Sequence, residues 1–222
     1  MLKKMKSMVT LGQPEVKQYL TAKDIERGKT LLLSNVMIGG HKPATYHRSG
    51  GATSVIILGN RTSTKDVDFI SSRPEEFNEI CDAKYEATQE LKTYPGDWLN
   101  SDMIAYVHGE PDCDKLFENS VNMGEIMYQS DVIVAYVADW RFQLVGKIQR
   151  CYMVAQSDGS DTRHLSDAIY ILILLVTRNG GPLSIAMIRT WYAIGPLLTM
   201  KELTFIDNCY QRHLGVVSGL TA

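Results

Sequence analysis

The spacing of apolar residues changes along the chain, and it predicts strands in the first part and mainly helices after them. Residues 66–70 read Asp-Val-Asp-Phe-Ile, so an extended chain would place the two aspartates on one face and Val67 and Phe69 on the other. A continuous apolar run over 132–137 predicts a buried strand over 131–137, paired with a strand over 124–129. A further strand is expected over 102–108, which is rich in β-branched and aromatic residues.

Apolar residues recur at helical spacing in most of the remaining chain. We predict helices over residues 14–37, 52–58, 115–119, 140–154, 165–177, 182–194 and 200–214. Another helix is expected to begin at Arg73-Pro74, with Phe77, Ile80 and Tyr85 recurring every three to five residues. Glycine and proline at 180–182 and 195–196 are expected to separate the last three helices.

These elements predict a mixed α+β fold, in which a mixed sheet flanked by helices is followed by a helical part. The expected divisions are an N-terminal helical segment over 1–39, a sheet domain over 40–138 and a helical domain over 139–222. With 222 residues and 45% hydrophobic content, the chain is long enough for one or two small domains with a buried core. We expect the functional site in the cleft between the sheet and the helical part.

Two aspartates on one face of a strand predict a metal site. Asp66 and Asp68 would lie roughly 6–7 Å apart along an extended chain. Carboxylates this close repel each other unless a cation lies between them, and their hard oxygen ligands suit Mg²⁺ or Mn²⁺. The alternative that we keep open is a surface strand with outward aspartates after a glycine turn.

A pair of glycines upstream of the aspartates predicts a phosphate site. Gly50 and Gly51 precede the apolar run that Gly59 ends, and glycines at the start of a helix let backbone N–H groups approach a phosphate closely. Residues 60–65 then supply hydrogen-bond donors and positive charge. The pieces together fit a metal-bound triphosphate. A second Asp-x-Asp, at 112–114, has no glycine pair before it, and we interpret it as a solvated turn.

Three segments carry a family resemblance: Gly50-Gly51-Ala52, Leu58-Gly59-Asn60-Arg61 and Thr64-Lys65-Asp66-Val67-Asp68. They resemble the signature of the DNA polymerase beta-type nucleotidyltransferase superfamily. Within it, the chain is most similar to AbiEii-like proteins of toxin–antitoxin systems and to uncharacterised fungal nucleotidyltransferase-like proteins. The likeness extends over residues 45–180, since 138–150 and 163–168 also resemble helices of those proteins. The polar strand residues 44–49 and His164 depart from the pattern.

The resemblance implies a nucleotidyltransferase-like fold and a role for each motif. The glycine pair would hold the triphosphate, Asp66 and Asp68 would bind the metal, and a third carboxylate on the next strand would complete the catalytic set. Asp97, Asp102 and Asp131 are candidates for the third carboxylate, and we favour Asp102 because it follows an intervening helix. The residues expected to bind the nucleotide are Gly50, Gly51, Arg61, Thr64, Lys65 and Lys147.

The function expected from these motifs is metal-dependent transfer of a nucleoside monophosphate from a triphosphate to an acceptor hydroxyl, with pyrophosphate released. RNA, a protein or a small molecule could each be the acceptor. The alternative is a protein of the same fold that does not transfer nucleotides and acts as a binding module or in another small-molecule reaction. The polar residues Tyr46, His47 and Arg48 before the glycine pair favour this alternative.

Composition limits the partners and the cellular compartment that we expect for the protein. A net charge of −2 and a pI near 6.2 give no general affinity for polyanions. The four cysteines have neither the spacing of a zinc site nor that of a disulfide framework, so we expect free thiols. The longest apolar run, 168–176, is too short to span a bilayer, and no signal peptide is evident. We therefore expect a cytoplasmic protein without a membrane partner.

Overall fold

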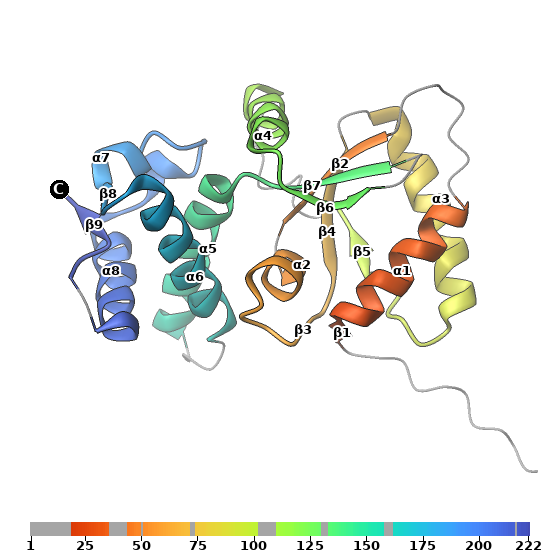
Figure 1. Cartoon of the computed structure of the whole chain (residues 1–222), viewed down its shortest axis with the longest axis horizontal. Helices are drawn as coiled ribbons and strands as arrows, with labels where there is room; N and C mark the ends of the chain where they lie inside the picture. Colours follow the sequence, from red (N-terminus) through yellow and green to blue (C-terminus); the bar gives the residue numbers. More distant parts are fainter. Residues whose placement is uncertain are drawn as a thin grey trace, which may run out of the picture.

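The computed structural model describes residues 19–35, 44–49, 51–71, 74–101, 110–129, 133–157, 162–215 and 217–222 (Figure 1). At its centre is a five-stranded sheet in the order β5-β4-β2-β7-β6. The strands are β2 (Ala44–Ser49), β4 (Val67–Ser71), β5 (Leu99–Asn100), β6 (Ile126–Gln129) and β7 (Ile133–Val137). Strand β2 runs antiparallel to β4 and parallel to β7, β5 is parallel to β4, and β6 is antiparallel to β7. The sheet is mixed, and the α+β fold expected from the sequence is confirmed.

Helices lie on both sides of this sheet (Figure 1). One group consists of α1 (Ala22–Asn35) and α3 (Pro74–Leu91). The other consists of α5 (Trp140–Ser157), α6 (Arg163–Asn179) and α8 (Met200–Leu214), which form the helical part. Helix α4 (Glu110–Met123) and the short α2 (Gly51–Thr53), which continues as the π-helical turn η1 (Ser54–Leu58), lie between the sheet and the helical part in this view.

The two faces of strand β4 differ in polarity, and each face is directed toward one of these groups of helices. Val67 and Phe69 are 0% and 4% exposed and belong to a core that also contains Ile25 of α1 and Ile80 of α3. Ile70 belongs to a second core, formed mainly by α5, α6 and α8. Because side chains alternate along a strand, Asp68 shares the face of Ile70. The polar face of β4 is therefore directed toward the helical part.

Helix α1 begins later than the sequence pattern predicts. Residues 20–21 form a short strand, β1 (Leu20–Thr21), paired antiparallel with β3 (Ser63–Thr64). The Thr21 hydroxyl accepts a hydrogen bond from the Asp24 backbone N–H (3.3 Å), and Asp24 Oδ2 accepts one from the Thr21 backbone N–H (3.0 Å). This reciprocal cap starts the helix at Ala22. The predicted residues 14–18 and 36–37 lie outside the described residues.

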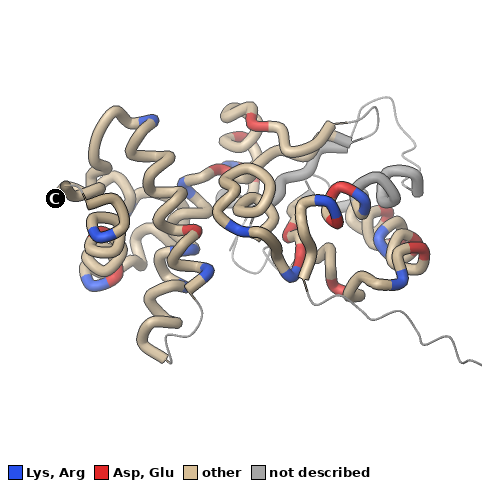
Figure 2. Tube along the Cα trace, turned by 60° about the horizontal axis from the view of Figure 1, so that its bottom comes forward, with Lys and Arg blue, Asp and Glu red and all other residues tan. Residues whose placement is uncertain are grey.

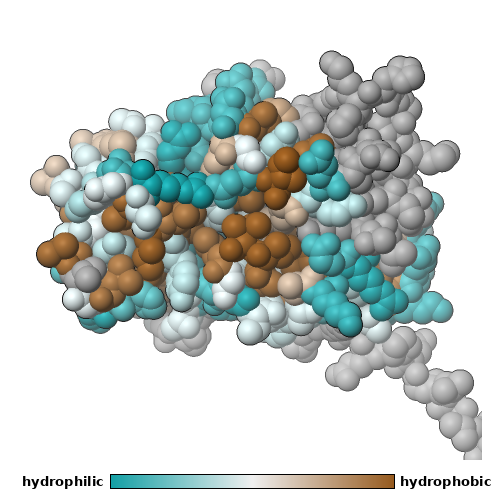
Figure 3. Space-filling view, in the orientation of Figure 1, coloured by the Kyte–Doolittle hydropathy of each residue, from teal (hydrophilic) through white to brown (hydrophobic). Residues whose placement is uncertain are grey.

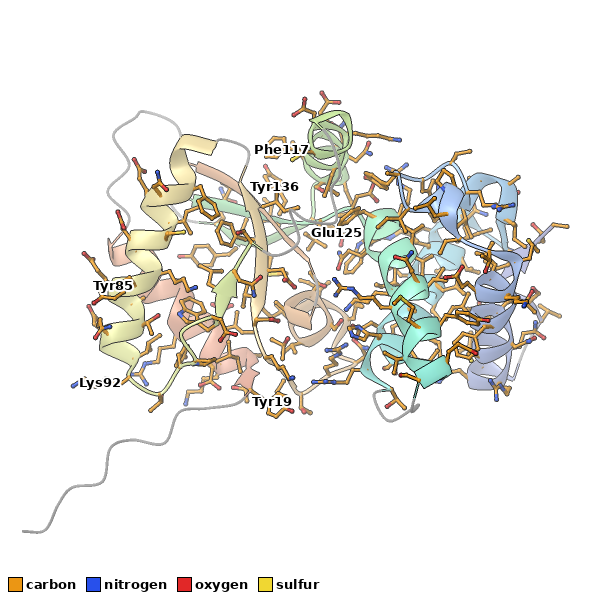
Figure 4. The ribbon with its side chains drawn as sticks, turned by 180° about the vertical axis from the view of Figure 1, so that it is seen from behind. Tyr19, Tyr85, Lys92, Phe117, Glu125 and Tyr136 are labelled. Atoms are coloured by element: carbon orange, nitrogen blue, oxygen red, sulfur yellow. The ribbon has the colours of Figure 1, made fainter. Side chains whose placement is uncertain are left out.

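Helix α3 begins where the sequence predicts it. Pro74 occupies the first helical position, where its missing N–H costs no hydrogen bond. Ile80 is 2% exposed and packs in the core, whereas Tyr85 is 67% exposed and points away from the ribbon in Figure 4. The expectation that Tyr85 belongs to the apolar stripe was wrong, because the core-facing positions of α3 are instead Ala83, Ala87 and Leu91.

The helical part confirms three of its four predicted helices. The bounds of α8 agree with the prediction, since Thr199 and Glu202 form a capping box and Gly215 ends the helix at φ 64°. Helices α5 and α6 extend the predicted ranges by two to three residues, and Gly180 ends α6 at φ 72°. The hydrophobic spacing in this region therefore reported the helices correctly.

The helix predicted over 182–194 is absent from the described structure. Residues 183–184 instead form β8 (Leu183–Ser184), which pairs in parallel with β9 (Leu220–Thr221). Only α7 (Ile185–Ile188) is helical, and Tyr192 takes a positive φ of 52°. The buried hydroxyl of Tyr192 donates to Asp139 over 2.6 Å. Long-range pairing with β9 and Asp139 overrides the local apolar spacing.

The second Asp-x-Asp is also placed differently from the prediction. Residues 112–114 lie within α4, which continues to Met123, so the expected turn and the short helix over 115–119 are one longer helix. The predicted strand pair is confirmed as β6 and β7, which run antiparallel. The strand expected over 102–108 lies outside the described residues, as does Asp131.

Candidate functional site

The sheet register brings the aspartate motif beside the glycine pair. Ser49, the last residue of β2, is the register partner of Asp68 on the antiparallel β4. Gly50 follows Ser49 and lies outside the described residues, and Gly51 begins α2. Asp66 and Asp68 are both half-buried, whereas Val67 between them is fully buried. Asp68 therefore lies at the end of β4 that is nearest the connection from β2 to α2, and Asp66 directly precedes this strand.

An asparagine takes the position beside Asp68 on the neighbouring strand. Asn100 is the register partner of Asp68, and Leu99 is the partner of Val67, on the parallel β5. Leu99 is 2% exposed and belongs to the core beneath Val67, so Asn100 faces the same side as Asp68. The strand that follows α3 thus offers an amide at this position. Asp102, the expected third carboxylate, lies outside the described residues, and Asp97 is exposed in the turn before β5.

Gly51 is held in a close fit by the residues that follow η1. A Cβ built on Gly51 would meet Thr64 Oγ1 at 2.0 Å and Arg61 Nη1 at 3.4 Å. Thr64 itself is 3% exposed. Only glycine fits here, because the approach of β3 leaves no room for a methyl group. Three of the predicted nucleotide-binding residues, Gly51, Arg61 and Thr64, therefore lie together, and Thr64 packs against Gly51. A fourth, Lys65, is exposed.

Arg61 and Lys147 converge on one buried carboxylate, that of Asp167 in α6. Asp167 accepts hydrogen bonds from Arg61 Nε (2.7 Å), Arg61 Nη2 (2.5 Å), Lys147 Nζ (2.7 Å) and Asn60 Nδ2 (3.1 Å). The Asp167 side chain is 0% exposed, and those of Lys147 and Arg61 are 8% and 11% exposed. This cluster, which we call the Asp167 cluster, joins the loop after η1 to α5 and α6.

Burial and neighbouring charges act on Lys147 in the Asp167 cluster. Burial lowers the pKa of Lys147, Asp167 acts in the opposite sense, and the neighbouring positive charges of Arg61 and Arg150 lower it further. Three basic groups therefore act around one carboxylate. In Figure 2, basic positions on the helical part and on the loop after α2 lie on facing sides of the junction.

Two buried polar atoms in the segment after Gly51 have no hydrogen-bond partner among the residues that the structure describes. They are Ser54 Oγ, at the start of η1, and Asn60 Oδ1, just after its end. Buried polar groups are nearly always paired, by the protein or by bound molecules. The π-helical turn between them reaches the surface, since Ile57 is 40% exposed and apolar atoms appear in the middle of the face in Figure 3. Ile57 is therefore at the surface, whereas residues 51–55 of the same segment are buried.

The side chains at this site are of the types that bind a divalent metal ion. Carboxylate oxygens of Asp66 and Asp68 are the ligands that Mg²⁺ and Mn²⁺ prefer, and an amide oxygen such as that of Asn100 is a further hard donor. Among the residues that the structure describes, no group of three or more His, Cys, Asp or Glu side chains is placed to hold a metal ion. The protein would thus supply two carboxylates, and a triphosphate would supply further oxygens.

Sequence reasoning missed two members of the site. Neither Asp167 nor Asn100 was among the expected site residues. An aspartate on the otherwise apolar face of a helix is the signal that could have indicated Asp167, because a buried charge requires a partner. Asn100 could not have been found without the register of β5, because its neighbours contain no motif.

Comparisons with known proteins gave no match. No family model matches the chain, and neither a curated protein nor a solved structure is significantly similar to it. Within the described ranges, every helix is too short or too polar to cross a membrane.

Proposed function

We propose that the protein is a metal-dependent nucleotidyltransferase of the DNA polymerase beta-type superfamily. The observation that supports this most directly is the register that pairs Asp68 with Ser49, the residue before the glycine pair. Asp66 and Asp68 would hold Mg²⁺ or Mn²⁺, and the backbone beside Gly51 would receive the triphosphate. Arg61 and Lys147, the two basic side chains of the Asp167 cluster, would lie next to the phosphates.

The reaction would join an acceptor hydroxyl oxygen to the α-phosphorus of a nucleoside triphosphate and release pyrophosphate. When bound, the metal ion would neutralise charge on the triphosphate and polarise its phosphoryl oxygens. The chain's own contribution is position and charge, since Gly51 is fixed by Thr64 and Arg61 is fixed by Asp167. The acceptor loses its proton in the same step, and in this proposal Asp102 assists that loss.

The test is transfer of label from α-³²P-labelled triphosphates to an acceptor in a cell extract, with and without Mg²⁺. We expect a labelled product with the native protein and a loss of about 10²-fold or more for Asp68→Asn, which removes one of two charges at the metal site. Asp114→Asn is the matched control, because Asp114 ends the second Asp-x-Asp and is exposed on α4. Equal labelling by the native protein and Asp68→Asn would overturn the proposal.

A second candidate function is a nucleotidyltransferase fold that binds a nucleotide without transferring it. The amide of Asn100 beside Asp68 favours it, because the third carboxylate was expected on the strand after α3. This candidate predicts thermal stabilisation by a triphosphate with Mg²⁺ but neither labelled product nor pyrophosphate. As part of either proposal we place the protein in the cytoplasm, where its four free cysteines, at 81, 113, 151 and 209, remain reduced.

A further inference from the structure

A pocket lies away from the aspartate motif, where α4, the start of α5 and the end of α6 meet. Its volume is about 310 Å³, within the size range of small-molecule sites, which starts at roughly 300 Å³. Helix α4 lines it with Asn119, Asn122 and Met123, and α6 lines it with Leu175 and Arg178. The remaining lining residues are Asp139, Trp140 and Arg141, at the junction of β7 and α5.

Arg141 is fixed on one side of this pocket. Its Nε and Nη2 atoms donate to Asp139 Oδ2 over 2.9 and 2.5 Å. Asp139 is 4% exposed and also accepts from the Tyr192 hydroxyl over 2.6 Å. Burial and this hydrogen bond raise the pKa of Tyr192, so it remains a donor. The Arg141 side chain is 39% exposed and keeps N–H groups that Asp139 does not use.

Arg178 is fixed on the other side by a similar arrangement. Its Nη2 atom lies 2.5 Å from Glu125 Oε1, and Glu125 Oε2 accepts from Trp140 Nε1 over 2.9 Å. Figure 4 shows Glu125 at the junction between the sheet and the helical part. The Arg178 side chain is 44% exposed. Two guanidinium groups from different helices are thus oriented by anchored carboxylates while both remain accessible from the pocket.

The remaining lining indicates the chemistry of a ligand. Met123 and Leu175 supply apolar surface, and the amide of Asn122 has no protein partner among the described residues. Arginine forks match the geometry of carboxylate and phosphate groups, which accept paired N–H bonds. We propose that this pocket binds a small organic anion, whose carboxylate or phosphate group lies against Arg141 and Arg178 and whose apolar part lies against Met123 and Leu175. The proposal does not depend on nucleotidyl transfer.

The test titrates the full chain with benzoate and with phenyl phosphate, and benzyl alcohol is the uncharged control. The readout is the indole N–H resonance of Trp140, assigned with Trp140→Phe, because this N–H donates to the carboxylate that holds Arg178. We expect a saturable shift of this resonance with at least one anion and none with benzyl alcohol. Tighter binding of phenyl phosphate identifies a phosphate ester as the ligand class, and tighter binding of benzoate identifies a carboxylate.

Substitutions of the two arginines test whether the anion binds in this pocket. Arg178→Gln should weaken the preferred anion by about tenfold or more, equivalent to roughly 1.4 kcal/mol. Arg141→Lys keeps the charge next to Asp139 and should weaken binding by a smaller factor, because it removes the fork. Arg189→Gln, at an exposed arginine after α7, is the matched control and should bind as the native protein does. Binding that is absent for both anions, equal for benzyl alcohol or unchanged in Arg178→Gln overturns the proposal.

Discussion

The substitution Asp167→Asn tests whether the Asp167 cluster holds the sheet to the helical part. It keeps the size of the side chain and removes the one negative charge that Arg61 and Lys147 share. The amide of asparagine would also direct N–H donors toward groups that are donors themselves. Both cations would stay almost fully buried, so water could not replace the lost carboxylate.

The expected loss of stability follows from the burial of both cations. Removing one partner of a buried ion pair costs about 3–5 kcal/mol, because it leaves an uncompensated charge. Lys147→Met should cost less, no more than about 1.5–3 kcal/mol for one hydrogen bond to a charged group. Asp167 keeps Arg61 in that variant, and the desolvation that lowers the pKa of Lys147 no longer applies. In the double variant the orphaned lysine is gone, so part of the loss should be recovered.

Urea unfolding at pH 7 and constant ionic strength measures these differences from the midpoints and slopes. We expect Asp167→Asn to be the least stable single variant, and the double variant to deviate from additivity by about 1 kcal/mol or more. Asp114→Asn, which changes an exposed aspartate, should stay within about 0.5 kcal/mol of the native protein. A cost below about 1 kcal/mol for Asp167→Asn, or an additive double variant, would refute the reasoning.

Three further predictions concern the glycine fit, the metal site and alkaline stability. Gly51→Ala should lower the free energy of unfolding by about 1–3 kcal/mol, because the added Cβ would meet Thr64 Oγ1 at 2.0 Å. The control Gly146→Ala has open space in α5 and should raise the free energy of unfolding by up to about 1 kcal/mol. Equal effects of the two substitutions in thermal unfolding would contradict this prediction. Asn100→Asp should tighten Mn²⁺ binding, measured by titration calorimetry, by about tenfold, since it adds a carboxylate beside Asp68; unchanged affinity would argue against a metal there. Burial raises the pKa of Cys151 from 9.0 to about 12 in the folded protein. As the pH rises, the thiol therefore loses its proton first in the unfolded chain, and the free energy of unfolding should fall between pH 9 and 10 by up to about 1.4 kcal/mol. Cys151→Ala should flatten this decline and the control Cys81→Ala should not, and identical slopes would exclude the explanation.

Local patterns predicted the elements whose pattern agrees with their tertiary surroundings. Residues 66–70 alternate because β4 has an apolar core on one side and a polar face on the other. Helix α8 was predicted to the residue because Thr199, Glu202 and Gly215 supply both caps within the sequence itself. In both cases neighbouring residues contain all the information that the element requires.

Long-range contacts decided the features that the sequence could not predict. Residues 182–194 have helical apolar spacing, yet β9 and Asp139, more than thirty residues away, determine their conformation. The position of Asn100 depends on how β5 aligns with β4, which no spacing along the chain encodes. Asp167 gains its role only because α6 packs beside the loop that carries Arg61.

Asp68 on β4 explains why polar contacts accompany the apolar ones that join the two halves of the molecule at this point. Ile70 can enter the core of the helical part, but Asp68 on the same face cannot, because an unpaired buried carboxylate is too costly. The helical part meets this end of the sheet through Gln143, which accepts from Thr53 over 2.8 Å, and through the Asp167 cluster. Arg61 therefore both fixes the junction and lies beside Gly51, so changes that loosen the junction should also disturb any phosphate bound there.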